Sequence, residues 1–425
     1  GISIGGYLQE QNGMAVSGQD IWNQAFDTPP FVHPIQYSGG RDVRIQNRQN
    51  PWAEATQHGY QTTSSSKVES LFSVEQDLKF ITPGLKFKGL FSFDRYSKSW
   101  VKRHRTPTYY NPATGRDEEG NLLLSVGTDG QEFLDTENKG EWGNKATYLE
   151  GNITYDRTFD GKHAVNAMFL YNQRDYQDGN VVPFRRMGIA GRASTTYDNR
   201  YIAEFNFGYN GSENFTKGNR FGFFPSVAVG YMLSEEKFME KYKDTFSKIK
   251  FRASWGLTGN DQLDGRRFAF LPTIDTDGSY KWGVNNDYNR ASRFEGEFGV
   301  TDLTWETVEK LNVGTEIGLW NALDLQVDWF KEQRRDIFMQ RNNIPSAGFR
   351  KTPWANYGKV DNIGVDLSLT YNQQITKDLH IGLRGTFTYA HNTIIEMDEA
   401  LGILGTNRQR TGHSVNELFG LVADG

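Results

Sequence analysis

The seven histidines of the chain are the first candidates for catalysis or metal binding, because imidazole is a common general base and a common metal ligand. They are scattered along the chain, and none forms a metal-ligand spacing with acidic residues. No pattern of serine, histidine and aspartate indicates a nucleophilic site. We therefore assign no catalytic residue and no metal site. The histidines are His33, His58, His104, His163, His380, His391 and His413.

Two acidic motifs have simple structural explanations. Asp275-Thr276-Asp277-Gly278 matches part of a calcium-binding loop but lacks the remaining ligands, so we interpret it as a turn. Glu235-Glu236 stands at the start of an expected helix, where carboxylates compensate the helix dipole. The chain contains no cysteine, which excludes disulfide frameworks, thiolate metal sites and cysteine nucleophiles. The sequence thus predicts a protein that is not an enzyme and needs no cofactor.

Aromatic rings outside the expected strands are the remaining candidates for a site. Flat rings offer a large apolar area at low entropy cost, which suits the faces of sugars or the surface of a partner protein. The alternative is that these rings pack the loops together, since aromatic residues generally prefer buried positions. The candidate contacts with substrate or partner are Trp52, Tyr109, Tyr110, Trp142, Trp282, Tyr288 and Trp354.

Residues 201–232 indicate the element that positions these loops. In the first half, apolar residues such as Phe205 and Tyr209 alternate with polar ones such as Glu204 and Asn206. A polar link follows, and then a second run with the same period, which predicts a hairpin of two strands. A soluble sandwich also alternates, but its apolar face favours aliphatic residues. So many aromatic residues on one face fit lipid better.

Similar runs recur along the chain and predict about thirteen strands of about 9–14 residues, long enough to cross a bilayer when tilted. The connections alternate between short and long, as in a transmembrane antiparallel β-barrel with short periplasmic turns and long extracellular loops. Residues 1–425 are therefore expected to form part of one all-β barrel domain. The long extracellular loops are expected at about 9–66, 97–144, 259–302, 335–358 and 392–416, and the short turns at Pro83, Gly161, Asn199 and Asn321.

One larger insertion lies on the short side. Residues 235–246 carry apolar residues at helical spacing after Ser234, which predicts a short periplasmic helix with a serine cap. Composition agrees with a barrel: 37% of the residues are hydrophobic and 14% aromatic, and the mean hydropathy is −0.65, because only alternate residues of such strands meet lipid. The net charge of −5 is spread along the chain, so we expect no nucleic-acid partner.

An odd number of strands conflicts with the even number of bacterial barrels, and an open edge cannot lie in lipid. The sequence therefore predicts a middle-to-late portion of a larger barrel, in a native polypeptide that extends beyond both ends.

Several stretches carry recognisable motifs. They are residues 219–230 (NRFGFFPSVAVG), 234–238 (SEEKF), 250–260 (KFRASWGLTGN), 303–307 (LTWET), 356–366 (NYGKVDNIGVD) and 419–425 (FGLVADG). Together they resemble the SusC/RagA family of TonB-dependent outer-membrane transporters of the Bacteroidetes. The resemblance covers most of the chain and is most specific after residue 195.

The resemblance implies a barrel of about 22 strands around an N-terminal plug. It also implies import of a nutrient across the outer membrane of a Gram-negative cell, with energy from the TonB complex acting through a plug region that has no counterpart in these residues. A SusD-like lipoprotein lid is the implied partner at the extracellular mouth, and two SusC–SusD pairs can form a dimer. Outer-membrane lipid surrounds the barrel.

Three classes of function follow. The first is active import of oligosaccharides, with oligopeptides as the alternative substrate. The second is a passive porin, which the elaborate loops disfavour. The third is an outer-membrane enzyme such as a barrel lipase or protease, which the absence of a catalytic pattern disfavours.

Overall fold

The computed structural model describes residues 1–425 except 30, 32, 47, 135–137, 180, 344–349 and 421–425, and the side chain of Asp277. The last five residues of the motif at 419–425 therefore lie outside the described residues. Contacts divide the chain into two compact units. The first comprises Gly1–Phe72, Phe91–Thr147 and Asp175–Pro183, and the second Ser73–Leu90, Tyr148–Arg174 and Phe184–Gly425.

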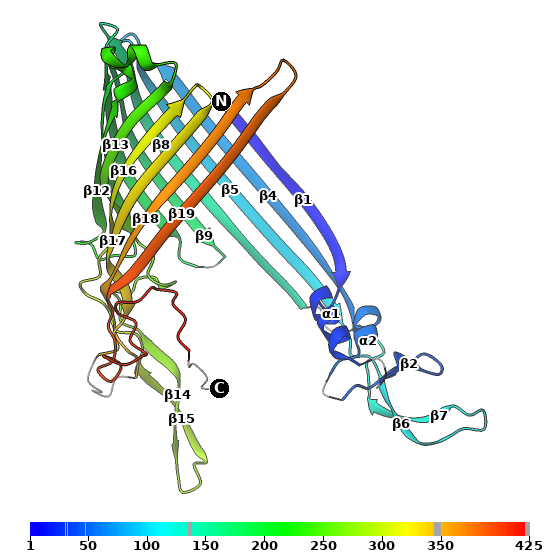
Figure 1. The fold of residues 1–425 in the computed structure, drawn as a ribbon. Coiled ribbons are helices and arrows are strands. Elements are labelled where there is room, and N and C mark those ends of the chain that lie inside the picture. The colour runs from blue at the N-terminus through cyan, green and yellow to red at the C-terminus, as the bar shows by residue number, and fades with distance from the viewer. Residues whose placement is uncertain are drawn as a thin grey trace, which may run out of the picture. The chain divides into compact units, whose positions relative to one another are not determined.

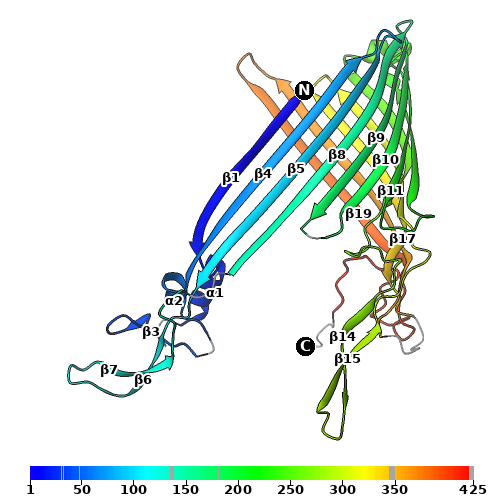
Figure 2. The same ribbon diagram turned by 180° about the vertical axis from the view of Figure 1, so that it is seen from behind.

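Thirteen long strands form one sheet, in which almost every strand pairs with its neighbour in the chain. This confirms the predicted all-β architecture and the expected number of strands. The strands in sheet order are β1 (Ile2–Met14), β4 (Gly59–Asp77), β5 (Leu85–His104), β8 (Asn138–Phe159), β9 (His163–Asp178), β10 (Phe184–Tyr197), β11 (Tyr201–Ser212), β12 (Phe221–Met232), β13 (Phe246–Asn260), β16 (Glu306–Leu319), β17 (Leu323–Gln340), β18 (Trp354–Gln374) and β19 (His380–Glu396). Figures 1 and 2 show them from opposite sides.

Eight of the thirteen long strands exceed the expected 9–14 residues, and the lengths run from 12 residues in β11 to 22 in β8. In β17 the apolar alternation stops after Trp329: Lys331 and Gln333 follow on the same face, and the strand continues to Gln340. Backbone ladder bonds persist in water, so a strand does not need to end where its apolar face ends. The alternation of apolar residues therefore marks the lipid-facing part of a strand and misses its polar extension. The loops expected at 9–66, 97–144 and 335–358 are shortened accordingly, and the first lies between Met14 and Gly59.

The tight turns lie where the sequence predicts them. Asp198 and Asn199 both have positive φ, as do Trp320 and Asn321. Two consecutive left-handed residues make the turn whose twist matches paired strands. The alternation between short and long connections is less strict than expected, because links 179–183 and 213–220 are shorter than the insertion at 233–245. Compact insertions and short loops thus occur on both sides of the meander.

The insertion forms two 3₁₀ helices, η1 (Leu233–Glu235) and η2 (Lys237–Tyr242), in place of one continuous helix. The expected serine cap is wrong: Ser234 is buried and makes no capping bond. Glu236 adopts an extended conformation between the two turns. Its carboxylate accepts hydrogen bonds from Arg200 at 2.8 Å and from the Tyr201 hydroxyl at 2.9 Å. These bonds, and not compensation of a helix dipole, explain this carboxylate.

The long connections contain further elements that the sequence pattern did not predict. In the first unit they are α1 (Gly18–Asp27), β2 (Gln36–Tyr37), β3 (Arg41–Val43), α2 (Pro51–Thr56), β6 (Tyr109–Arg116) and β7 (Leu122–Thr128). In the second unit they are β14 (Ile274–Trp282) and β15 (Tyr288–Glu295), which project beyond the loop end of β17 (Figure 2). Within the described part of the chain, no helix is long and apolar enough to cross a membrane.

Candidate functional site

The long strands have one apolar and one polar face. On β11 and β12 the apolar side chains remain exposed: Phe223 is 55% accessible and Val229 59%. Two such strands pair with Phe205 opposite Val227 and Tyr209 opposite Phe223. A contiguous apolar surface of this kind needs a cover, and lipid provides one. The polar face is therefore the side on which a solute can be bound.

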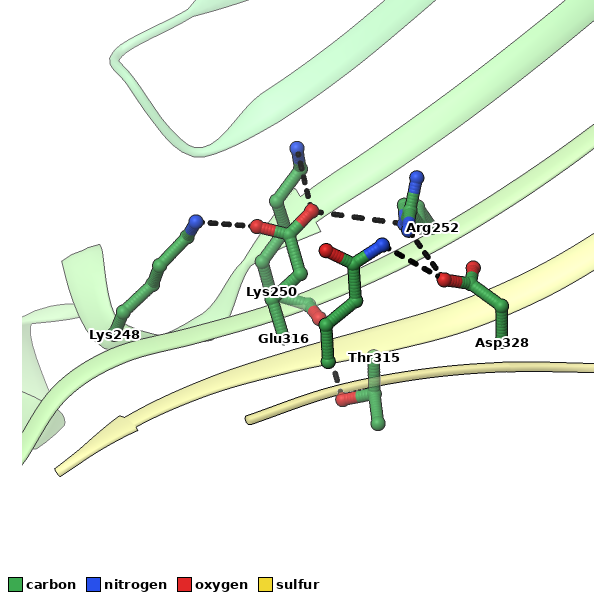
Figure 3. Close-up of polar contacts among 7 residues, drawn as sticks. Lys248, Lys250, Arg252, Thr315, Glu316 and Asp328 are labelled. Atoms are coloured by element: carbon green, nitrogen blue, oxygen red, sulfur yellow. Dashed lines mark hydrogen bonds and ion pairs between the residues drawn. The ribbon is translucent and has the colours of Figure 1, made fainter. Parts of the chain in front are cut away.

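A network of charges crosses the polar face of β13, β16 and β17 (Figure 3). Glu316 on β16 is paired with Lys248 and lies 3.4 Å from Lys250 Nζ. Arg252 Nη2 contacts Asp328 Oδ2 at 2.6 Å. We call this set, completed by Gln326 with a bond of 2.9 Å to Asp328, the Glu316 network. It holds three cations and two carboxylates.

Gly314 allows the network to form. It is the register partner of both Arg252 and Asp328. A Cβ atom at this position would lie 2.1 Å from Asp328 Oδ1 and 3.0 Å from Arg252 Nε. Only glycine lets side chains from the two flanking strands meet above β16. Asp328 is buried, but the three cations are partly accessible, so the pairs fix geometry more than they add stability.

The connections of the first unit fold into what we call the first loop assembly: α1, β2, β3, α2, β6 and β7. Its centre combines buried polar side chains with buried apolar ones. Buried Asp42 accepts a hydrogen bond from Gln36 Nε2 at 2.9 Å, and buried Asn50 caps α2 while donating to Val43 O at 3.1 Å. Burial, followed by the charges of Glu54 and Asp42, raises the pKa of the Tyr109 phenol above its usual range.

We call the connections 213–220 and 261–305, together with the loop ends of β17 and β18, the second loop assembly. It has an aromatic centre. Its core consists of Phe215, Leu263, Val300, Leu303, Trp305 and Phe338. The rings of Phe215 and Trp305 lie 5.0 Å apart, and Phe338 stacks on Trp354 at 5.2 Å. The Arg266 guanidinium covers Trp354 at 4.2 Å. Here buried apolar side chains stabilise the fold of the loops.

The acidic motif at Asp275 and two of the histidines lie in ordinary structural surroundings. The stretch from Asp275 to Gly278 belongs to β14, and the expected turn is wrong: it pairs with β15 across a register shift, and the missing Cβ of Gly278 makes room for Phe294. His58 and His104 stack at 5.9 Å. Among the residues that the structure describes, no three histidine, cysteine or acidic side chains are grouped so that they could hold a metal ion.

A family comparison agrees with this geometry. The model described as "TonB dependent receptor-like, beta-barrel" matches residues 9–418. The chain belongs to this family. Membership confirms the predicted SusC/RagA-type resemblance and places the chain in the outer membrane, in a family of receptors and transporters that are not enzymes.

Individual relatives of this TonB-dependent receptor barrel are distant. TonB-dependent receptor P3 of Formosa agariphila is 24% identical over 406 residues, which cover 92% of this chain and 39% of that protein. TonB-dependent receptor SusC of Bacteroides thetaiotaomicron is 30% identical over 209 residues, 49% of this chain and 20% of SusC. The solved RagAB peptide importer in its "closed-closed" state has the same fold, with a TM-score of 0.64 at 17% identity, covering 89% of this chain and 41% of that one. The chain spans about two fifths of the curated relatives that it matches along most of its length.

The expectation that the seven predicted contact residues lie outside strands is wrong for six of them, because only Trp52 stands on a helix. The structure does not gather the seven into one site. Trp282 and Tyr288 are register partners on β14 and β15. Tyr109 is only 6% accessible, and Trp354 is part of a stack. Arg41 covers Tyr110 at 5.6 Å. The exposed rings are Trp52 (45% accessible), Trp142 (42%), Trp282 (62%) and Tyr288 (52%).

Sequence reasoning missed the Glu316 network. Its members stand on three strands, and each charge occupies an ordinary polar position of the alternating pattern. Gly314 between them was the available signal, because a glycine inside a strand often marks a close approach of neighbouring groups.

Proposed function

We propose that this chain forms part of the barrel of an active importer that moves oligosaccharides across the outer membrane with energy from the TonB complex. Oligopeptides are the alternative substrate, which the fold shared with the RagAB peptide importer supports. The observation that carries the proposal is that long connections fold into two loop assemblies with exposed rings. A passive pore has little need of such assemblies.

The loop assemblies are proposed to face the cell exterior and to bind a SusD-like lipoprotein lid, with the tight turns in the periplasm. Trp52, Trp142 and Trp282 are the best-placed contacts, because their rings are accessible. Exposed aromatic residues are typical anchors of interfaces and of sugar faces. Two pairs of barrel and lid are proposed to form a dimer, as the resemblance implies.

The test uses cells of the native host. Uptake of labelled oligosaccharides and of labelled peptides is compared in the wild type, in a strain lacking this gene and in a strain lacking TonB. Sugar uptake that needs both genes is expected. Peptide uptake alone establishes the alternative substrate, and uptake that needs this gene but not TonB identifies a passive pore.

Topology has a separate test. Protease added to intact cells is expected to cut near Trp52, Tyr109, Trp282 or Trp354. It is expected to spare the turns at Pro83, Gly161, Asn199 and Asn321. Cleavage confined to the second group contradicts the proposed orientation.

A further inference from the structure

A cavity of about 340 Å³ opens on the polar face of the second unit. Its polar lining comes from four consecutive strands and from the connection after β13. The contributing polar residues are Tyr148 on β8, Asn172 and Arg174 on β9, Arg186 on β10, Asn210 on β11 and Asp261. The volume is at the lower end of the range for ligand pockets, about 300–1,000 Å³. None of these residues belongs to the Glu316 network.

Two glycines leave room for the Asn210 amide. A Cβ atom on Gly188 would lie 2.4 Å from Asn210 Oδ1, and one on Gly208 would lie 3.2 Å from Asn210 Nδ2. Gly188 is the register partner of Asn210. Larger residues at these two positions would displace the amide.

One wall of the cavity is held in place without a ligand. Arg186 forms a two-pronged pair with Asp261, at 2.9 Å from Nε and 2.7 Å from Nη2. Asn214 Nδ2 donates to the backbone carbonyl of Asp261 at 3.0 Å. Bidentate arginine–carboxylate pairs fix orientation as well as charge. The pair also cancels its own charge, so this wall does not select an ionic ligand.

The side-chain amide of Asn210 is available to form hydrogen bonds with a ligand. Its side chain is exposed, and within the described residues it makes no hydrogen bond. An amide presents two donors and an acceptor in one plane. That arrangement matches two neighbouring hydroxyl groups of a sugar, each of which donates and accepts. Ligand pockets use a few such convergent polar groups to set specificity.

We propose that this cavity is a subsite for one or two rings of a neutral oligosaccharide, with Asn210 as the residue that binds the hydroxyl pair and Arg186–Asp261 as the positioning wall. The inference rests on the proposed import function. Neutral sugars are the expected ligands, because Arg186 is already paired with Asp261 and Arg174 also has an interaction partner within the protein.

The test compares Asn210→Ala with Asn206→Ala in the full-length protein in its native host. Asn206 lies on the same strand and face, but its amide is bonded to Glu204 at 2.8 Å and it does not line the cavity. Uptake of labelled neutral oligosaccharides of glucose, xylose and fructose is measured, with an oligogalacturonide as the acidic probe. Loss of one hydrogen bond predicts that Asn210→Ala raises KM about 3- to 10-fold for the neutral sugar taken up. Asn206→Ala should leave it unchanged.

Folding of each variant is checked by heat-modifiable gel mobility, and Asn210→Asp, which keeps the shape, replaces the alanine variant if that one misfolds. Equal KM values for the Asn210 variant and the control overturn the subsite while leaving import intact. A preference of the wild type for the acidic probe overturns the substrate class. A wild type without TonB-dependent uptake of any probe refutes the proposed function itself.

Discussion

The two loop assemblies solve the same folding problem with different chemistry. Each is built from long connections between strands. The first buries Asp42, Asn50 and Glu54 at its centre, whereas the second buries Phe215, Leu303 and Trp305. Buried polar groups must keep every hydrogen bond, while an apolar core depends on area and fit. The first assembly should therefore depend on individual bonds and the second on volume.

The largest expected effect tests the aromatic assembly. Trp305→Ala should destabilise the second assembly by about 3–5 kcal/mol, the usual cost of removing a buried large aromatic side chain. The Trp305 ring centroid lies 5.0 Å from that of Phe215 and 5.4 Å from that of Phe224. The segments that carry these three positions should therefore lose order together in the variant. Hydrogen exchange of the purified full-length protein measures this. The control Trp22→Ala removes an exposed ring of α1 and should have little effect; equal loosening by both variants would contradict an aromatic core.

The polar assembly gives the next largest effect. Asn50→Ala removes a helix cap, worth about 1 kcal/mol, and leaves the buried carbonyl of Val43 without its donor, which adds about 1–3 kcal/mol. Faster hydrogen exchange in α2 and β3 is the expected result. Ser17→Ala, which removes the exposed cap of α1, is the matched control and should cost only the capping term. If the two variants increase hydrogen exchange by the same amount, the buried bond from Asn50 to Val43 does not add to the stability of the first assembly.

This difference also explains what the sequence could predict. Strands such as β11 follow from the alternation of Phe205 and Glu204, because lipid and water impose opposite requirements on the two faces. Loop cores were harder to predict. Aromatic residues in loops indicate folded structure, but the bond from Asn50 to Val43 depends on a turn that has no periodic signal. Likewise, Asn210 and Asp261 line the same cavity only once four strands are paired in register. A single sequence therefore does not predict this cavity.

Acid should weaken the hydrogen bonds that Asp398 accepts in the second unit. Asp398 accepts hydrogen bonds from Arg341 Nε at 2.8 Å and from the backbone amide of Asn342 at 2.7 Å. Burial acts to raise the pKa of Asp398, but these bonds outweigh it and hold the pKa below its usual value. A lowered pKa in the folded state adds stability above the unfolded value, about 3.9, and this stability is lost as the pH falls through the folded value.

The measurement is hydrogen exchange of residues 397–413, corrected for the intrinsic effect of pH on exchange. The wild type should be protected at pH 7 and lose protection below about pH 4, and Asp398→Asn should be less protected at pH 7 and respond less to acid. Protection in the wild type that does not change down to pH 3 would show that the carboxylate is not the anchor.

The smallest effect on folding should separate stability from partner binding. Trp52 in the first assembly and Trp282 in the second are both exposed, and substitutions at such positions usually change stability by less than about 0.5 kcal/mol. If the rings contact the proposed lipoprotein, Trp52→Ala and Trp282→Ala will each reduce the amount of lipoprotein that co-purifies from native membranes, because exposed aromatic anchors contribute much of the binding energy of an interface.

Trp320→Ala at a tight turn removes an equally exposed ring from the opposite end of a strand and should leave co-purification unchanged. A loss with only one of the two loop variants assigns the partner to that assembly. No loss with either variant, in protein of normal stability, means that these rings do not hold the lid.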